Sequence, residues 1–142
     1  MNWSQKNETL LFVGWTSALL ATAGSLFYSE VMGYTPCELC WIQRIFMYPL
    51  VIIYGVAIVK KNMDIAFSGI FLSGIGMLIS LYHYGLQKIP ALQNSGGFCG
   101  TIPCNLQYVN YLGFITISFL AGTAFILIFT LHIVLLVRIR RK

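Results

Sequence analysis

Four cysteines fall into two pairs whose spacing suits thiol chemistry. Cys37 and Cys40 form a C-x-x-C, in which two sulfurs can lie close together at the start of a helix and cycle between dithiol and disulfide. Cys99 and Cys104 have four residues between them, in a glycine-containing segment. Four cysteines in an oxidising compartment allow three disulfide pairings. The residue types therefore indicate either thiol–disulfide exchange or structural disulfides.

The surroundings of Cys40 favour a reactive thiolate. Pro36 precedes the first pair and a long apolar run follows it, so Cys40 is expected near a helix N-terminus, where the helix dipole stabilises negative charge. Arg44 follows Cys40 by four residues, which places its charge on the same helix face one turn deeper. Glu38 opposes the thiolate if its side chain points the same way. The alternative for Arg44 is an interfacial anchor that extends its charge to water.

Two other interpretations of the cysteines are structural disulfides and a zinc site. A C-x-x-C bridge closes too short a loop to stabilise a fold by much, which weighs against a purely structural role. Zinc is commonly held by four thiolates, but the second pair is loosely spaced for such a site. We expect no metal.

The elements that must position these residues are long apolar helices. Of the 142 residues, 58% are hydrophobic and 9% are charged, a balance typical of a membrane protein. Spanning the hydrocarbon requires about 20 mostly apolar residues in a helix. We predict one integral membrane domain over residues 1–142, an all-α antiparallel bundle of four transmembrane helices with two extracytoplasmic loops. The expected spans are residues 10–28, 41–59, 65–84 and 111–137.

The distribution of basic residues predicts the orientation of these spans. Short cytoplasmic segments are enriched in Lys and Arg, and seven of the nine basic residues fall on one side of the predicted topology. Both termini are therefore expected in the cytoplasm and all four cysteines outside, in a multi-pass protein of the cell membrane. The net charge of +5 is concentrated in the C-terminal tail, which indicates a lipid-facing anchor and no nucleic-acid partner. The alternative for the first apolar run is a cleaved signal peptide with a small-residue site at 21–23.

The chain resembles the disulfide bond formation protein B (DsbB) family, in its short BdbC-like form. The resemblance rests on PCELCWIQR at residues 36–44, the four-span layout, the second cysteine pair, and residues 83–87 at the outer end of the third span. It implies a protein-disulfide oxidoreductase that uses a quinone, either menaquinone or ubiquinone, to reoxidise a DsbA/BdbD-like thiol oxidase of thioredoxin fold. This activity would support disulfide bond formation in exported proteins.

The resemblance also implies a role for each cysteine. Cys40 would be the thiol next to the quinone, and Cys37 its partner. Cys99 would exchange with the partner protein, and Cys104 would pass electrons to Cys37. Arg44 would stabilise charge beside the quinone.

Two further polar residues follow from the same resemblance. His83 would lie near the quinone ring, together with Gln87. The alternative is that His83 is an interfacial aromatic residue between Tyr82 and Tyr84, in a belt where such rings are common. His132, near the opposite end of the fourth span, is interpreted as structural or interfacial.

Other classes of function fit the sequence less well. A membrane scaffold with structural disulfides is the first alternative, and a quinone-linked reductase of the vitamin K epoxide reductase type is the second. A transporter is disfavoured because the predicted spans contain no Asp or Glu, which ion-coupled transport commonly uses.

Overall fold

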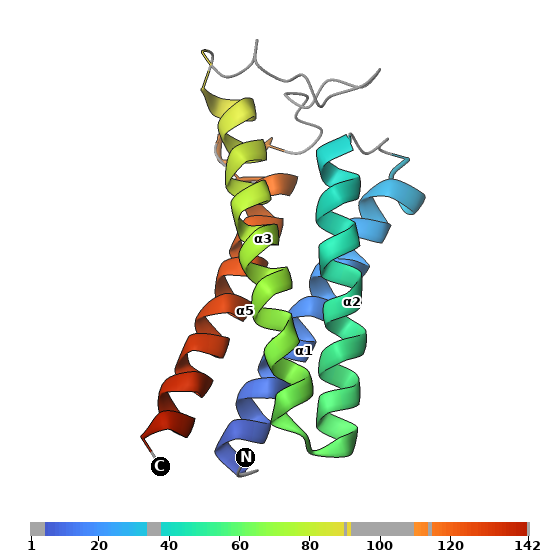
Figure 1. The fold of residues 1–142 in the computed structure, drawn as a ribbon. Coiled ribbons are helices and arrows are strands. Elements are labelled where there is room, and N and C mark those ends of the chain that lie inside the picture. The colour runs from blue at the N-terminus through green and yellow to red at the C-terminus, as the bar shows by residue number, and fades with distance from the viewer. Residues whose placement is uncertain (1–4, 34–37, 90, 92–109, 114, 142) are drawn as a thin grey trace.

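The part of the chain that the structure describes folds into four long helices, which the computed structural model in Figure 1 shows. The structure describes residues 5–33, 38–89, 91, 110–113 and 115–141. The elements in chain order are α1 Gln5–Leu26, the π-helical turn η1 Phe27–Val31, α2 Glu38–Lys60, α3 Met63–Lys88, the strands β1 Asn110–Tyr111 and β2 Ile115–Thr116, and α5 Ile117–Arg140.

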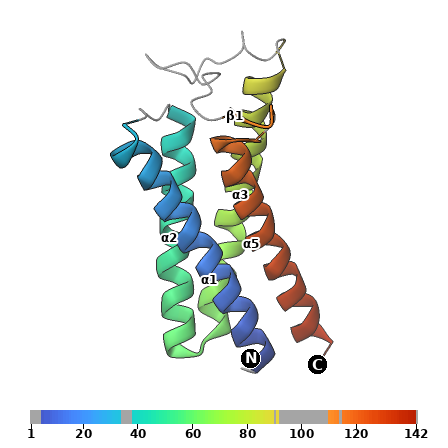
Figure 2. The same cartoon turned by 180° about the vertical axis from the view of Figure 1, so that it is seen from behind.

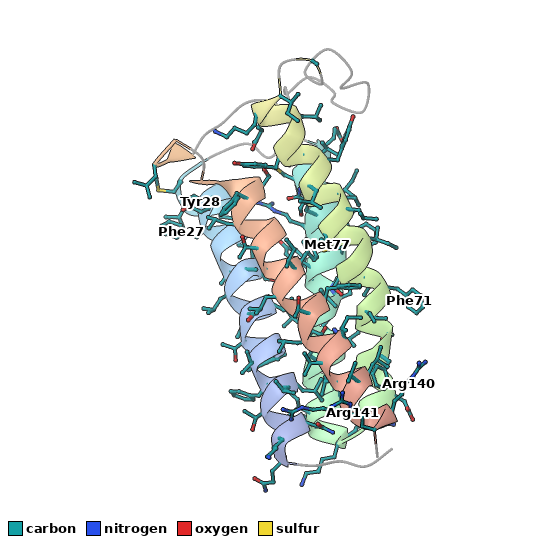
Figure 3. The ribbon with its side chains drawn as sticks, turned by 90° about the vertical axis from the view of Figure 1, so that its left-hand side faces the viewer. Phe27, Tyr28, Phe71, Met77, Arg140 and Arg141 are labelled. Atoms are coloured by element: carbon teal, nitrogen blue, oxygen red, sulfur yellow. The ribbon has the colours of Figure 1, made fainter. Side chains whose placement is uncertain are left out.

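Among the described residues, four helical stretches are long and apolar enough to cross a membrane: Gln5–Val31, Glu38–Lys60, Phe67–Lys88 and Ser118–Arg138. A continuous helix satisfies its own backbone hydrogen bonds, which the hydrocarbon core of a bilayer demands. Large apolar side chains cover the outside, such as Phe71 of α3, which is 73% exposed and points away from the bundle in Figure 3. The predicted all-α membrane fold with four spanning helices is therefore confirmed.

The helices form a ring in which each packs against two neighbours. α2 lies between α1 and α3, and α5 closes the ring between α3 and α1. Seen from the other side, Figure 2 shows the same arrangement, with the N- and C-terminal ends together at one end of the bundle. The start of α2 and the end of α3 lie at the opposite end, which we call the Cys40 end.

The turn between α2 and α3 is set by local hydrogen bonds. The backbone N–H of Asn62 donates to the carbonyl of Ala57 and that of Lys61 to Ile58, while Lys61 has a φ of 50°. This is the bonding pattern of a Schellman motif, which closes a helix with a left-handed residue. The side chain of Asn62 then accepts a bond from the N–H of Asp64 and caps α3. The turn thus makes α2 and α3 an antiparallel pair.

The fourth long helix, α5, begins several residues after the first residue of its apolar run. The sequence predicted a span from about residue 111, but α5 begins at Ile117, and the preceding residues form a short antiparallel ribbon with Tyr111 opposite Ile115. Leu112 and Gly113 have φ values of 56° and 83° and so cannot continue a right-handed helix. Lys88 at the end of α3 donates to the carbonyl of Gly113 at 2.7 Å, which ties the ribbon to α3.

The inner face of α3 carries small and polar residues at heptad spacing. All of them are buried: Gly69, Ser73, Gly76, Ser80, His83 and Gln87. The ring of Phe125 from α5 fills the space over Gly76, where an added Cβ would lie 2.3 Å from a ring carbon. This face allows close packing of α3 on α5 and becomes polar towards the Cys40 end.

Candidate functional site

Cys40 lies in the first turn of α2 and is half-buried. It packs beside Leu39 and Leu86, which are both buried, together with Ile42 and Ile79. The sulfur therefore has an apolar setting at the N-terminal end of a helix, as the sequence predicted for the helix position. The other three cysteines, Cys37, Cys99 and Cys104, lie outside the described residues.

Arg44 is buried between α1 and α2, with only 7% of its surface exposed. Its Nε donates to the hydroxyl of Ser25 at 2.7 Å, and its Nη2 donates to the backbone carbonyl of the same serine at 2.9 Å. The guanidinium carbon also lies 5.2 Å from the centre of the Trp41 ring, within cation–π range. These contacts hold the charge inside the bundle, so the interpretation of Arg44 as an anchor reaching for water is disfavoured.

The backbone carbonyl of Ser25, which accepts a hydrogen bond from Arg44, lies just before the π-helical turn η1. In this turn the N–H of Met32 bonds to the carbonyl of Phe27, five residues back, which widens the helix. Figure 3 shows Phe27 and Tyr28 of this turn at the Cys40 end, far from Arg140 and Arg141 at the other end. The carbonyl that accepts from Arg44 therefore lies at the junction between α1 and the wider turn.

His83 is 1% exposed and bonds to α2. The side-chain nitrogen of Gln43, also buried, lies 3.1 Å from Nδ1 of His83. A residue of an interfacial aromatic belt would reach towards the membrane surface, whereas this ring is enclosed by the bundle. The burial of His83 therefore disfavours the belt interpretation.

Gln87 joins α3 to the start of α5. The hydroxyl of Ser118 donates to Oε1 of Gln87 at 2.8 Å, and both side chains are buried. Gln87 is one turn after His83 on α3, so the two buried polar contacts are stacked along one helix face. The structure thus brings the predicted residues His83 and Gln87 to the same end of the bundle as Cys40 and Arg44.

Three partners of the predicted residues were missed by the sequence analysis. Gln43 holds His83, Ser25 holds Arg44 and Ser118 holds Gln87. Gln43 could have been found from helix periodicity, because it follows Leu39 by four residues and so shares its buried face. Ser25 and Ser118 belong to other helices, and no sequence signal pairs them with their partners.

The fold and the site define a helical membrane protein with a half-buried cysteine and several buried polar groups at one end. Comparison with known proteins identifies the family: the family model for the disulfide bond formation protein DsbB matches residues 7–137. The chain therefore belongs to the DsbB family, and its role is in disulfide bond formation.

Named relatives agree with this assignment. A probable disulfide formation protein of Oceanobacillus iheyensis is 58% identical over 140 residues, which cover 98% of this chain and 97% of that protein. The disulfide bond formation protein C of Bacillus subtilis is 46% identical over 118 residues, covering 83% of this chain and 86% of its own length. No solved structure matches the chain significantly.

Proposed function

We propose that the protein is a quinone-linked thiol oxidase that reoxidises a thioredoxin-fold partner outside the cytoplasmic membrane. The observation that carries the proposal is the convergence of Cys40, Arg44 and the Gln43–His83 pair at one end of the bundle. In this proposal the thiol, the fixed positive charge and the buried polar pair serve one ligand.

The surroundings of Cys40 fit a quinone. A quinone has an apolar ring with two carbonyl oxygens, so its site needs apolar walls and a few placed donors. Leu39, Leu86 and Ile42 supply apolar surface around Cys40. His83 and Gln87 supply polar groups that are already held in place by bonds to neighbouring helices. When bound, a quinone accepts the two electrons and two protons that a dithiol releases on becoming a disulfide.

In this proposal the two cysteine pairs carry out successive exchange steps. A thiolate of the partner attacks the Cys99–Cys104 disulfide, and the resulting mixed disulfide resolves to give an oxidised partner and a reduced pair. The Cys104 thiolate then attacks the Cys37–Cys40 disulfide at Cys37, which forms a Cys104–Cys37 mixed disulfide and releases Cys40 as the thiolate next to the quinone. Cys99 resolves this mixed disulfide, so the Cys99–Cys104 bond forms again and Cys37 becomes a thiol. Each exchange breaks one sulfur–sulfur bond and forms another, and the two electrons that reach Cys37 and Cys40 come from the dithiol of the partner.

Arg44 contributes a charge whose position does not change during these exchanges. The two hydrogen bonds to Ser25 fix the guanidinium, so it can stabilise negative charge on a nearby sulfur or oxygen without reorganising. The orientation of the membrane domain is part of the proposal. Basic residues at the end that holds both termini support a cytoplasmic location for that end and an outer location for Cys40.

The test is steady-state reduction of a short-chain quinone by a reduced thioredoxin-fold partner, using the purified protein in detergent. We expect Cys37→Ser and Cys40→Ser each to abolish turnover while the protein stays monodisperse. Ser17→Ala is the control, since the Ser17 hydroxyl donates to the carbonyl of Val13 within its own helix. Turnover that persists in both cysteine variants would refute the proposal.

A further inference from the structure

Three hydroxyl groups inside the bundle have no hydrogen-bond partner among the described residues. They belong to Thr22 of α1, Tyr48 of α2 and Ser80 of α3. Seven other serine and threonine hydroxyls in the helices donate to a backbone carbonyl three or four residues earlier. Thr22 and Ser80 do not, so their hydroxyls are available to a group outside their own helix. Because an unsatisfied buried polar group is costly, this arrangement indicates a partner that the described chain does not supply.

Thr22 and Tyr48 lie at the same level of the α1–α2 interface. Arg44 of α2 contacts Ser25 of α1, and the two helices run in opposite directions (Figure 1). One turn further from the Cys40 end is therefore reached three residues earlier on α1 and four residues later on α2. These positions are Thr22 and Tyr48, so both follow the Arg44–Ser25 contact along one interface.

Ser80 lies at this level as well, on the inner face of α3. Gln43 meets His83 of α3, and Ser80 is three residues before His83, again one turn further from the Cys40 end. Ser80 is 1% exposed, and a Cβ added at Gly122 of α5 would lie 3.3 Å from its Cβ. Three helices thus each contribute a hydroxyl at one level of the bundle, and the fourth contributes a glycine.

Thr22, Tyr48 and Ser80 together form what we call the hydroxyl layer. On the side of this layer away from the Cys40 end, the ring of Phe125 fills the space over Gly76. Phe125 is fully buried, so the interior becomes apolar about one turn beyond the layer. On the other side lie the polar contacts of the candidate site. The hydroxyl layer is therefore the inner end of the polar region that begins at the Cys40 end.

We propose that the hydroxyl layer binds the quinone carbonyl oxygen that is remote from Cys40, with Thr22, Tyr48 and Ser80 as the hydrogen-bond donors. The identity of the ligand as a quinone rests on the proposed function. The layer is one turn further into the bundle than Arg44, which is about 5.4 Å along a helix axis. The two oxygens of a para-quinone lie on opposite sides of one six-membered ring, so a single ring can reach both levels.

A hydroxyl suits this position because it serves both redox forms of the ligand. The carbonyl oxygen of a quinone only accepts hydrogen bonds, whereas the hydroxyl of the quinol also donates one. Oxidation of the dithiol supplies the two electrons and two protons that convert the first form into the second. A guanidinium can only donate, but serine, threonine and tyrosine hydroxyls both donate and accept. The hydroxyl layer can therefore hold the ligand before and after its reduction.

Tyr48→Phe and Thr22→Val test the layer, because each removes a hydroxyl and keeps the shape of the side chain. The probe is dimethylnaphthoquinone, bound to protein whose cysteine pairs are both oxidised, so that no turnover occurs. Each substitution is expected to weaken binding about threefold to tenfold, since one hydrogen bond is lost. In the quinone-free protein neither should lower the free energy of unfolding, because neither hydroxyl has a partner there among the described residues.

Two control substitutions carry the opposite expectations. Thr16→Val removes a hydroxyl of α1 that donates to the carbonyl of Phe12, and it should not change the quinone affinity. Tyr54→Phe removes the contact with His132, so it should lower the free energy of unfolding and leave the quinone affinity unchanged. Equal quinone affinity in the controls and in both variants of the layer would overturn the inference. A loss of stability in the quinone-free variants of the layer would also overturn it, because the hydroxyls would then already be satisfied.

Isotope-edited infrared spectroscopy of ¹³C-carbonyl-labelled dimethylnaphthoquinone shows which oxygen the layer binds, because a hydrogen bond lowers the stretching frequency of a carbonyl. We expect two lowered carbonyl bands in the unsubstituted protein. One should return towards its free frequency in Tyr48→Phe, and the other in Arg44→Ala. A single band that responds to both substitutions would contradict the assignment to the remote carbonyl. A protein that neither binds nor reduces the quinone would instead refute the proposed function.

Discussion

At the scale of single residues, the site depends on polar groups that are enclosed and satisfied by neighbouring helices. Arg44 and His83 are both buried in a bundle whose surface is apolar, and each is held by a side chain from another helix. Leaving such a group without its partner costs about 1–3 kcal/mol, and more when the group is charged. The partners Ser25 and Gln43 are therefore expected to matter nearly as much as the residues they hold.

Arg44→Ala is expected to raise the apparent Michaelis constant for quinone about tenfold, because the fixed positive charge is lost. The exchange step at Cys99, measured as the rate of mixed-disulfide formation with the partner, should change little. Ser25→Ala should change quinone kinetics in the same direction but by less, since the backbone carbonyl of residue 25 still accepts from Nη2. Unchanged quinone kinetics in Arg44→Ala would remove this residue from the site.

At the scale of the elements, the close approach of α3 and α5 depends on glycine. Gly76 faces the ring of Phe125, which is fully buried, whereas an added Cβ at Gly24 of α1 would meet nothing within 4 Å. The two positions therefore differ in packing although both lie inside long helices. This contrast makes them a matched pair for testing the helix interface.

Gly76→Ala is expected to lower the free energy of unfolding by about 1–3 kcal/mol, because Phe125 must leave its position. Gly24→Ala should be neutral or slightly stabilising, since alanine favours a helix over glycine. Both values can be measured by reversible unfolding in mixed micelles. Equal stability of the two variants would mean that α3 and α5 do not approach as closely as described.

A second contact ties α2 to α5 in the half of the bundle nearer the termini. The hydroxyl of Tyr54 lies 3.0 Å from the ring nitrogens of His132, and both residues are buried over Gly69. His132, expected from the sequence to be structural or interfacial, therefore has a buried partner. The pair crosses the ring of helices and links elements that otherwise have few contacts.

Tyr54→Phe is expected to destabilise the protein by about 0.6 kcal/mol, with about 1.7 kcal/mol as the upper end for such bonds in membranes. Tyr48→Phe is the matched control, because the buried hydroxyl of Tyr48 has no hydrogen-bond partner among the described residues. Its removal should leave the free energy of unfolding unchanged or raise it. A larger loss in Tyr48→Phe than in Tyr54→Phe would contradict the assignment of this contact.

Most of the helical architecture could be predicted from the sequence, because uncharged apolar runs leave few alternatives in a bilayer. The start of α5 could not be predicted, since the left-handed turn at Leu112 and Gly113 lies inside a continuous apolar run. The position of Cys40 at a helix start followed from the motif. The hydrogen bond from Arg44 to Ser25 could not be predicted, because it depends on how α1 and α2 are rotated relative to each other.

At the scale of the whole molecule, the proposal requires that the Cys40 end face the outside. Basic residues cluster at the opposite end, where Lys61 lies in the turn after α2 and Arg138 and Arg140 lie in the last turn of α5. Negatively charged cytoplasmic lipid surfaces and the insertion machinery both favour such clusters on the inner side. The asymmetry of charge thus predicts the direction in which the bundle is inserted.

Single cysteines introduced into a variant without the native ones can test the orientation. Met32→Cys lies on the exposed surface after η1, and Lys61→Cys lies in the exposed turn at the other end. In intact cells a membrane-impermeant thiol reagent should label Met32→Cys, and it should label Lys61→Cys only after permeabilisation. The reverse pattern would place the cysteine pairs in the reducing cytoplasm.

The proposed function requires that electrons pass from Cys40 to a quinone. The most direct measurement is a single turnover under anaerobic conditions, in which the protein is reduced, freed of reductant and mixed with a short-chain quinone while quinol absorbance and free thiols are followed together. We predict one quinol for each dithiol that becomes a disulfide, and none in Cys40→Ser. Thiols that are oxidised only when oxygen is admitted, with no quinol formed, would contradict the proposed function.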